Sequence, residues 1–460
     1  MSEKTRRDTK HEKQPDERGI SVPIVAGSLV ALLAFTALAV DLGWFYIIDQ
    51  QTQRAADAAA LAGVIELPGD TVAAEATAKE VATTNGFADE LDITGLFPQV
   101  VPTVLAGNRL EVEVRTEVPT FFLGVLGFDS MEIASTAIAE YVPPLRLGSD
   151  DNQFGNSCNQ TYEDANGTGV DCGDDYFANI HGKYTSSVMG DAYSSACLNA
   201  NGSSSCTPNP TWRDTGYLYG IERDTAASIQ VDFLDMAFHN GSLNGDYRRT
   251  GDNRCGSGGS CGQTVTANLY APSPQPLTLD PADLICSHTW APQPQVDESA
   301  PYVWENPAGC FTVGSAVNGV YRLQIVVENP TNDGNLGLNR YSLRVNAGAK
   351  LYGLRDMSIY NNTEGGTSTF KLAEVLPYYA GKTFVIEMYD AGESSQNGTI
   401  RLIDPRTGSV YADGCRIFKR DHTASTWTPN GTPSDCEELV TPGEYNGDWL
   451  KFEVDLPDTY

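Results

Sequence analysis

The chain has 460 residues and a formal net charge of −30 at pH 7. A chain of this length exceeds one ordinary domain, so we expect two or three. So acidic a surface repels nucleic acid, which excludes nucleic acid as a partner. Residues 1–19 contribute nothing to the net negative charge, because they contain six basic and five acidic residues.

An uncharged apolar segment follows this polar tail. Ile20–Val40 holds twenty-one residues without a charge, which is long enough to cross a bilayer as a helix. Trp44–Tyr46 is wholly aromatic and stands where an aromatic belt would lie. The basic residues precede the segment, and the next one after it is Arg54. The positive-inside rule therefore predicts a single-pass protein of the cytoplasmic membrane, with residues 1–19 as a cytoplasmic tail and the bulk outside the cell.

A cleaved signal peptide is the alternative interpretation of this segment. Ala37-Leu38-Ala39 has the A-x-A form of a cleavage site. The helical pattern nevertheless continues through these residues with no helix breaker. This continuity favours a retained anchor.

The segment from Asp49 to Val64 consists mostly of alanine, so residues 20–64 are predicted to form one transmembrane and extended helix. Alanine buries little surface, but small side chains let backbones approach closely. The partner would be either the protein's own small domain or a neighbouring subunit, and the alternative is a loosely packed helix. The predicted packing stripe consists of Ala55, Ala58, Ala59 and Ala62.

This part of the chain resembles a known family. Asp41-Leu42-Gly43 is followed by glutamines and then by AADAAALAG at Ala55–Gly63, and Arg18-Gly19 precedes the apolar run. The pattern is similar to the N-terminal segment of TadE/TadG-like proteins of the Flp (tight-adherence) pilus assembly system, over roughly residues 17–145. The resemblance implies a bacterial membrane protein. Its implied partners are pilus-apparatus proteins, or further copies of itself through the N-terminal helix.

Two departures from the family pattern limit what the resemblance implies. Pilin-like members cut by a prepilin peptidase carry a glutamate five residues after the cleavage glycine, whereas here Ile24 stands five residues after Gly19. We therefore expect an anchor that is not processed. Larger members often carry a von Willebrand A domain with a D-x-S-x-S metal motif, and this sequence lacks that motif.

Residues 65–145 are predicted to form a small α+β domain. Residues 71–84 have the composition of a second short helix. Leu110–Val114 alternates apolar and acidic residues after a Gly107-Asn108 turn, which is typical of a half-buried strand. The fold class predicted for the whole chain is α+β.

After this domain the pattern changes to short strands and turns, which favours an all-β, sandwich-like region. We divide it into a disulfide-bonded β-rich domain at residues 146–300 and a jelly-roll-like β-sandwich at residues 301–460. The division is placed where a second strand-rich stretch begins. Apolar residues alternate with polar ones in the predicted strands Ile229–Phe233, Tyr321–Val327, Phe384–Met388, Ile400–Leu402 and Leu450–Leu456.

All ten cysteines lie after residue 150, with no C-x-x-C motif or nearby histidine pattern. Zinc sites are therefore not expected, and disulfides in an oxidising compartment are, with buried free thiols as the alternative. Sequence does not determine the connectivity, and pairs that close short loops are the simplest. These pairs are Cys158–Cys172, Cys197–Cys206, Cys255–Cys261, Cys286–Cys310 and Cys415–Cys436.

One acidic loop resembles a calcium-binding template. Its oxygen-bearing side chains recur at alternate positions, and Gly169 permits the sharp turn that the template needs. The alternative is a surface turn closed by a disulfide. The candidate Ca²⁺ ligands are Asp164, Asn166, Thr168 and Asp175.

No catalytic residue is predicted. Gly258–Gly262 matches G-x-S-x-G, but it lies in a glycine-serine loop between two cysteines instead of between a strand and a helix. A secreted hydrolase is therefore the least favoured function. The predicted function is structural: a membrane-anchored assembly protein or minor subunit of a Flp/Tad-type surface apparatus, with β-sandwich domains outside the cell. The alternative is a single-pass surface adhesin or glycan-binding protein unrelated to pili.

Overall fold

The computed structural model divides into two compact units, Met1–Val142 and Pro143–Tyr460. Helices dominate the start of the first unit, and most of the described strands that follow pair antiparallel, so the predicted α+β class is confirmed. The structure describes residues 21–458 apart from gaps of up to three residues and longer gaps at 89–98, 156–175, 182–212, 241–263, 295–302, 329–337, 361–366 and 390–396.

The first unit is organised around one long helix. α1 (Ser21–Val64) runs unbroken through Ala37–Ala39, as the sequence predicts. It is long and apolar enough to cross a membrane, judged by length and composition. α2 (Thr71–Thr84) begins where Asp70 accepts hydrogen bonds from two backbone N–H groups of its first turn, a normal N-cap. The predicted second helix is confirmed.

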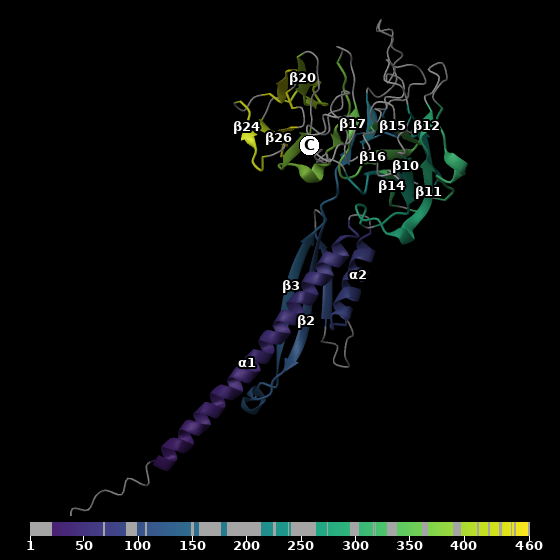
Figure 1. The fold of residues 1–460 in the computed structure, drawn as a ribbon. Coiled ribbons are helices and arrows are strands. Elements are labelled where there is room, and N and C mark those ends of the chain that lie inside the picture. The colour runs from purple at the N-terminus through teal and green to yellow at the C-terminus, as the bar shows by residue number, and fades with distance from the viewer. Residues whose placement is uncertain are drawn as a thin grey trace, which may run out of the picture. The chain divides into compact units, whose positions relative to one another are not determined.

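Three antiparallel strands complete the first unit: β1 (Gln99–Leu105), β2 (Arg109–Pro119) and β3 (Ser130–Glu140). Figure 1 shows the β2–β3 hairpin lying along α1, with α2 beside it. Every second residue of Leu110–Val114 is fully buried, and the acidic residues between them are partly exposed. The half-buried strand predicted here is confirmed, because one face of the sheet packs against both helices.

The second unit contains two larger sheets built from strands that are distant in sequence. Among the described residues, the first sheet has the order β11 (Leu284–Trp290), β10 (Thr264–Tyr270), β14 (Val320–Glu328), β7 (Tyr217–Arg223), β16 (Ala349–Gly353), β4 (Arg146–Leu147), β18 (Ala373–Glu374). The second has β13 (Thr312–Val313), β8 (Ile229–Leu234), β15 (Leu338–Val345), β6 (Phe177–His181), β17 (Ile359–Tyr360), with β5 (Gln153–Phe154) also paired to β15. β9 (His239–Asn240) and β12 (Gln293–Pro294) form a short parallel pair.

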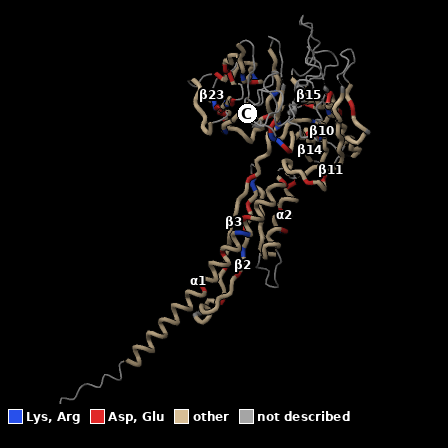
Figure 2. The backbone as a smooth tube through the Cα atoms, viewed as in Figure 1, with Lys and Arg blue, Asp and Glu red and all other residues tan. Residues whose placement is uncertain are grey.

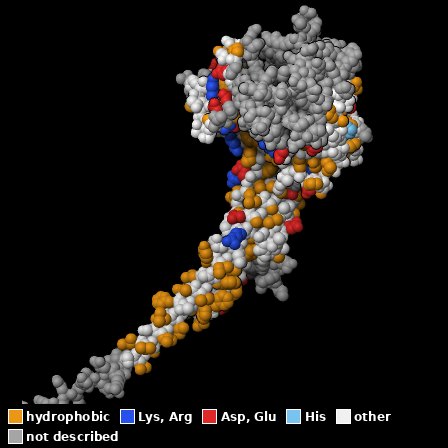
Figure 3. Space-filling view, viewed as in Figure 1, with side chains coloured by type: hydrophobic (Ala, Val, Ile, Leu, Met, Phe, Trp, Pro, Cys, Tyr) orange, Lys and Arg blue, Asp and Glu red, His pale blue; other side chains and the backbone are white. Residues whose placement is uncertain are grey.

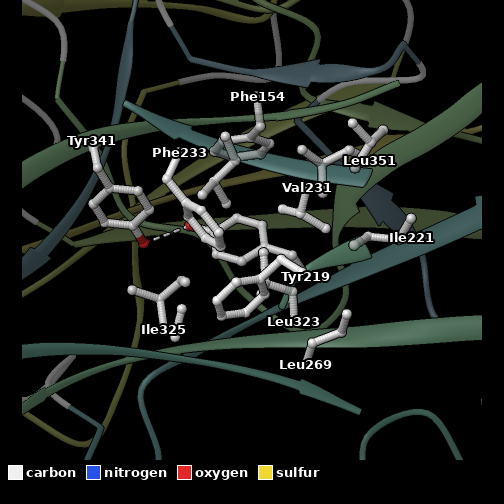
Figure 4. Packing of buried hydrophobic residues seen from close by; sticks show 14 of the residues in the cluster. Phe154, Tyr219, Ile221, Val231, Phe233, Leu269, Leu323, Ile325, Tyr341 and Leu351 are labelled. Atoms are coloured by element: carbon white, nitrogen blue, oxygen red, sulfur yellow. Dashed lines mark hydrogen bonds between the residues drawn. The ribbon is translucent and has the colours of Figure 1, made fainter. Parts of the chain in front are cut away.

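The two sheets share one hydrophobic core. Figure 4 shows Tyr219 of β7 reaching Tyr341 of β15, and their hydroxyl oxygens lie 2.8 Å apart. Burial raises the pKa of both phenols, so the pair stays neutral and links the sheets by a hydrogen bond inside the core.

The boundary expected near residue 300 falls inside these sheets. β10, which precedes it, pairs along its whole length with β14, which follows it. β7 and β14 also pair, as do β8 and β15. Residue 300 therefore does not separate two sets of sheets, because strand pairing is decided by contacts between segments remote in sequence.

The last part of the chain forms smaller sheets around a separate core. Cys415–Cys436 joins the first residue of one strand to the residue just before another, and Cys286–Cys310 lies in the preceding region. Both disulfides are among the predicted short-loop pairs. The described strands are β19 (Thr383–Tyr389), β26 (Trp449–Asp455), β23 (Cys415–Arg420), β24 (Thr428–Pro429), β20 (Gly398–Arg401), β25 (Glu437–Val440), β21 (Ile403–Asp404) and β22 (Ser409–Val410). One-turn 3₁₀ helices are η2 (Leu123–Leu126), η4 (Pro281–Asp283), η5 (Pro307–Gly309) and η6 (Pro377–Tyr379).

Candidate functional site

The second half of α1 buries a face of small side chains against the rest of the first unit. The spacing of three and four residues puts these positions on one side of the helix. Apolar burial is small for each alanine, so the stability of this face comes from close contact summed over its length. Its buried members are Thr52, Ala55, Ala56, Ala59, Ala60, Gly63 and Val64.

The predicted packing stripe overlaps this face but does not coincide with it. Ala55 and Ala59 are 0% exposed, whereas Ala58 and Ala62 are partly exposed beside Leu61, which is 65% exposed. The alanine face packs on the protein's own sheet and on α2. Ala58 and Ala62 therefore lie at the border between the packed face and the free face of the helix.

Gly63, the last residue of the AADAAALAG motif, lies where α1 packs directly against α2. A Cβ atom at this position would lie 2.5 Å from the carbonyl oxygen of Ala74 and 2.5 Å from Cδ2 of Leu110. No side chain fits there, so glycine permits the contact between the helices. Ala74 and Ala78 are fully buried on the α2 side.

Asp41, the acidic residue of the D-x-G motif, binds the tip of the β2–β3 hairpin. Its side chain is 1% exposed. One carboxylate oxygen accepts a hydrogen bond from the N–H of Phe121 (2.9 Å), and the other accepts from Phe122 (3.0 Å) and Leu123 (2.7 Å). These N–H groups precede and begin the one-turn helix η2, where they have no partner within the turn. The carboxylate thus satisfies them and fixes the hairpin tip to α1.

The tip itself is a tight connection between two strands. The Thr120 N–H donates to the carbonyl of Asp129 (3.1 Å), and the Phe128 N–H donates to the carbonyl of Leu123 (3.2 Å). Gly127 has φ 89°, a left-handed conformation that glycine adopts at little cost. Trp44 of α1 packs edge-on against Phe121, with ring centroids 5.9 Å apart. Asp41 and Trp44 therefore hold the same tip from one side of α1.

Sequence analysis did not identify this contact between α1 and the tip. Asp41 was recognised only through the family motif, and its partners lie about 80 residues further along the chain. The available signal was local: Val118–Phe128 carries no charge, although it follows a stretch of β2 rich in charged residues. Such a pattern is unusual for a surface turn.

Residues 19–75 match the family model described as putative Flp pilus-assembly TadE/G-like. This segment is TadE/G-like. The match confirms the resemblance in the N-terminal region, and it includes both Asp41-Leu42-Gly43 and Ala55–Gly63. It ends within α2, before the three strands. The matched family suggests a structural rather than a catalytic role. No curated protein matches the chain.

The predicted calcium loop and six of the ten cysteines lie in parts of the chain that the structure does not describe. Asp164, Asn166, Thr168 and Asp175 lie outside the described residues, as do the six cysteines from Cys158 to Cys261. Within the part of the chain that the structure describes, no group of three or more His, Cys, Asp or Glu side chains is arranged to hold a metal ion. The calcium loop and the three remaining disulfide pairs stay predictions.

Proposed function

We propose that this protein is a single-pass, membrane-anchored component of a Flp/Tad-type pilus apparatus, acting in assembly or as a minor structural subunit. The observation that carries the proposal is the TadE/G-like match at residues 19–75, with an apolar helix at its start. Asp41 and Gly63, which belong to the two motifs of that segment, each make a specific contact within the first unit. These contacts support a packed first unit that α1 anchors in the membrane.

The proposed orientation places residues 1–19 in the cytoplasm and the rest outside. It rests on the basic residues that precede α1 and on the acidic character of the chain beyond it. Disulfides at Cys286–Cys310 and Cys415–Cys436 suit an oxidising compartment. Protease added to intact spheroplasts should digest the chain beyond about the end of the predicted span and spare the tail. A protected C-terminus would reverse the orientation.

Association with an apparatus is tested by purifying the tagged full-length protein from native membranes after cross-linking. Pilus-secretion components should co-purify with the wild type. Ala58→Leu adds bulk beside the exposed Leu61, where a neighbouring subunit would contact the free face of α1. Ala76→Leu makes the same change on an exposed position of α2 and is the matched control.

Loss of the partners with Ala58→Leu but not with Ala76→Leu would support assembly through α1. Recovery of the full-length protein without any secretion component would contradict the pilus function. If both variants co-purify with the secretion components to the same extent, the protein still associates with the apparatus. This face of α1 is then not the contact surface.

The alternative function is a surface adhesin or glycan-binding protein, for which exposed aromatic rings would be the usual platform. Several of the described aromatic side chains near the C-terminus are instead covered by a cation on one face. The Arg420 guanidinium carbon lies 4.6 Å from the ring centroid of Trp427 and 4.9 Å from that of Trp449. Lys451 lies 4.2 Å from the centroid of Phe418. These contacts favour a structural use of the rings. Glycan-array binding by the full-length protein, without apparatus partners, would favour the adhesin.

A further inference from the structure

The β2–β3 hairpin ends in an apolar tip that the described part of the first unit does not cover. Four large apolar side chains of this tip remain exposed, although the tip contacts α1. The exposed fractions are 58% for Phe121, 49% for Phe122, 87% for Val125 and 61% for Phe128. Large apolar side chains gathered at an exposed turn mark an interaction surface.

The charge pattern around the tip has a sharp boundary. Val118–Phe128 contains no charged residue, and it is flanked by Glu117 and Asp129. Ser21–Val40, the part of α1 before Asp41, carries no Lys, Arg, Asp or Glu (Figure 2), and Figure 3 shows hydrophobic side chains gathered over this part of α1 and on the hairpin tip beside it. The two apolar surfaces are therefore neighbours, and acidic side chains begin directly behind the tip.

The depth of the tip follows from its contacts with α1. Asp41 and Trp44 hold it, so it lies next to the helix about twenty residues after Ser21. At 1.5 Å per residue this is about 30 Å along the axis, the thickness of a bilayer's hydrocarbon core. When α1 spans the membrane from Ser21, the tip is at the outer boundary of that core.

We propose that the β2–β3 hairpin tip, through Phe121, Phe122, Val125 and Phe128, inserts into the outer face of the lipid bilayer as a second membrane contact beside α1. The proposal rests on the membrane anchoring of the proposed function and extends it. A transmembrane helix alone can rotate and tilt about its axis. Two contacts at different points fix both the tilt and the rotation of the first unit relative to the membrane.

Lipid is the occupant that fits this surface best. The tip is continuous with the exposed apolar surface of α1, and Ser21–Val40 is long and apolar enough to lie among acyl chains. Asp41 also suits this depth. Three backbone N–H groups donate hydrogen bonds to its carboxylate, which offsets the cost of placing a charge beside apolar groups. A second copy of the chain would have to cover both the turn and the helix beside it.

The test uses the full-length protein in phosphatidylethanolamine–phosphatidylglycerol vesicles that contain a phospholipid with a diazirine on its acyl chain. After irradiation, labelled peptides are mapped by mass spectrometry. The expected result is label in the first half of α1 and in Val118–Asp129, with none around Ile138, an exposed residue at the opposite end of β3. Val125→Asp should abolish the label in the tip and leave that in α1 unchanged. Ile138→Asp, the matched control, should change neither.

The outcomes separate this inference from the function on which it rests. Label in α1 with none in the tip would overturn insertion of the tip and leave the anchor intact. Absence of label from α1 would overturn membrane anchoring, and with it the inference. A tip that is free of lipid label but cross-links to another copy of the chain would show that protein covers this surface, which also overturns the proposal.

Discussion

Gly63 of α1 faces the backbone of Ala74 in α2 so closely that a Cβ atom at position 63 would lie 2.5 Å from the Ala74 carbonyl oxygen. Both neighbours that such an atom would meet at this distance belong to the core of the first unit, and one of them is backbone. The space cannot be opened by turning a flexible side chain. The contact explains why a helix of small residues has glycine at its penultimate position: the second helix packs directly against it.

Gly63→Ala should therefore destabilise the first unit. Forced overpacking in a closed site typically costs about 1–3 kcal/mol of unfolding free energy. Gly43→Ala is the control, since it makes the same change in the same helix at a position with nothing within 4 Å. That substitution should be neutral or stabilising by up to about 1 kcal/mol. Urea unfolding of the full-length proteins in detergent measures both. Equal stability of the two variants would show that α2 is not packed as described.

Asp41→Ala should release the hairpin tip from α1. The substitution leaves the N–H groups of Phe121, Phe122 and Leu123 without their acceptor, and an unsatisfied buried donor costs about 1–3 kcal/mol. The expected result is faster hydrogen exchange in the peptide that contains these three amides. Asp57→Ala removes an exposed carboxylate that accepts a hydrogen bond from Gln53, and it should leave that exchange unchanged. Unaltered protection in Asp41→Ala would mean that Trp44 alone holds the tip.

The features that sequence predicted correctly depend on local pattern. α1 and α2 follow from helix formers without breakers, and β2 follows from strict alternation after a turn residue, Asn108, whose φ is 58°. The two described disulfides close short loops, so sequence proximity alone suggested their pairing. In each case the residues that decide the structure are close together in the chain.

The features that sequence missed depend on which distant segments meet. β7 and β8 pair with β14 and β15 across residue 300, and alternation cannot identify the partner of a strand. The Asp41–hairpin contact was missed for the same reason. Arg322 was missed as a buried residue, since it occupies a position of β14 at which alternation predicts exposure, yet it is 0% exposed.

Arg322 stabilises the connection between β10 and β11. Its guanidinium donates hydrogen bonds to the carbonyl oxygens of Ala271 (3.0 Å) and Thr278 (2.5 Å) and to the carboxylate of Asp283 (2.7 Å). Arg322→Met should leave these acceptors without a donor. The Asp283 side chain is 33% exposed, so the cost comes mainly from the carbonyl acceptors, and leaving such groups without a donor costs about 1–3 kcal/mol.

The matched control for Arg322→Met is Arg401→Met. Arg401 pairs with Glu437 at 2.7 Å, but both side chains are more than 40% exposed. An exposed pair contributes at most about 1 kcal/mol. Thermal unfolding of the full-length variants should therefore separate them clearly. Similar melting temperatures would show that the connection between β10 and β11 contributes little to the stability of the second unit.

The C-terminal sheet should lose stability in acid through Asp455 of β26. Arg416 donates to both carboxylate oxygens of Asp455 (2.8 and 2.9 Å), and the Thr383 hydroxyl donates to one of them (2.9 Å). These hydrogen bonds, that from Arg416 most of all, lower the pKa of Asp455 from 3.8 to about 2. Because the pKa is lower in the folded state, the ionised carboxylate contributes stability above about pH 4, and this contribution is lost as the pH falls towards 2. Urea midpoints of the full-length protein should therefore fall over this range.

Asp455→Asn removes the titrating group and should flatten this part of the pH dependence. Arg416→Gln should flatten it too, because without the guanidinium the pKa of Asp455 returns towards its ordinary value and the folded and unfolded states titrate alike. Both variants should also be less stable than the wild type at neutral pH, where the ion pair is intact. An unchanged slope between pH 4 and 2 in Asp455→Asn would assign the acid sensitivity to other carboxylates. Glu453, whose pKa is lowered by hydrogen bonds from Lys451 and Arg416, would then be the next carboxylate to substitute.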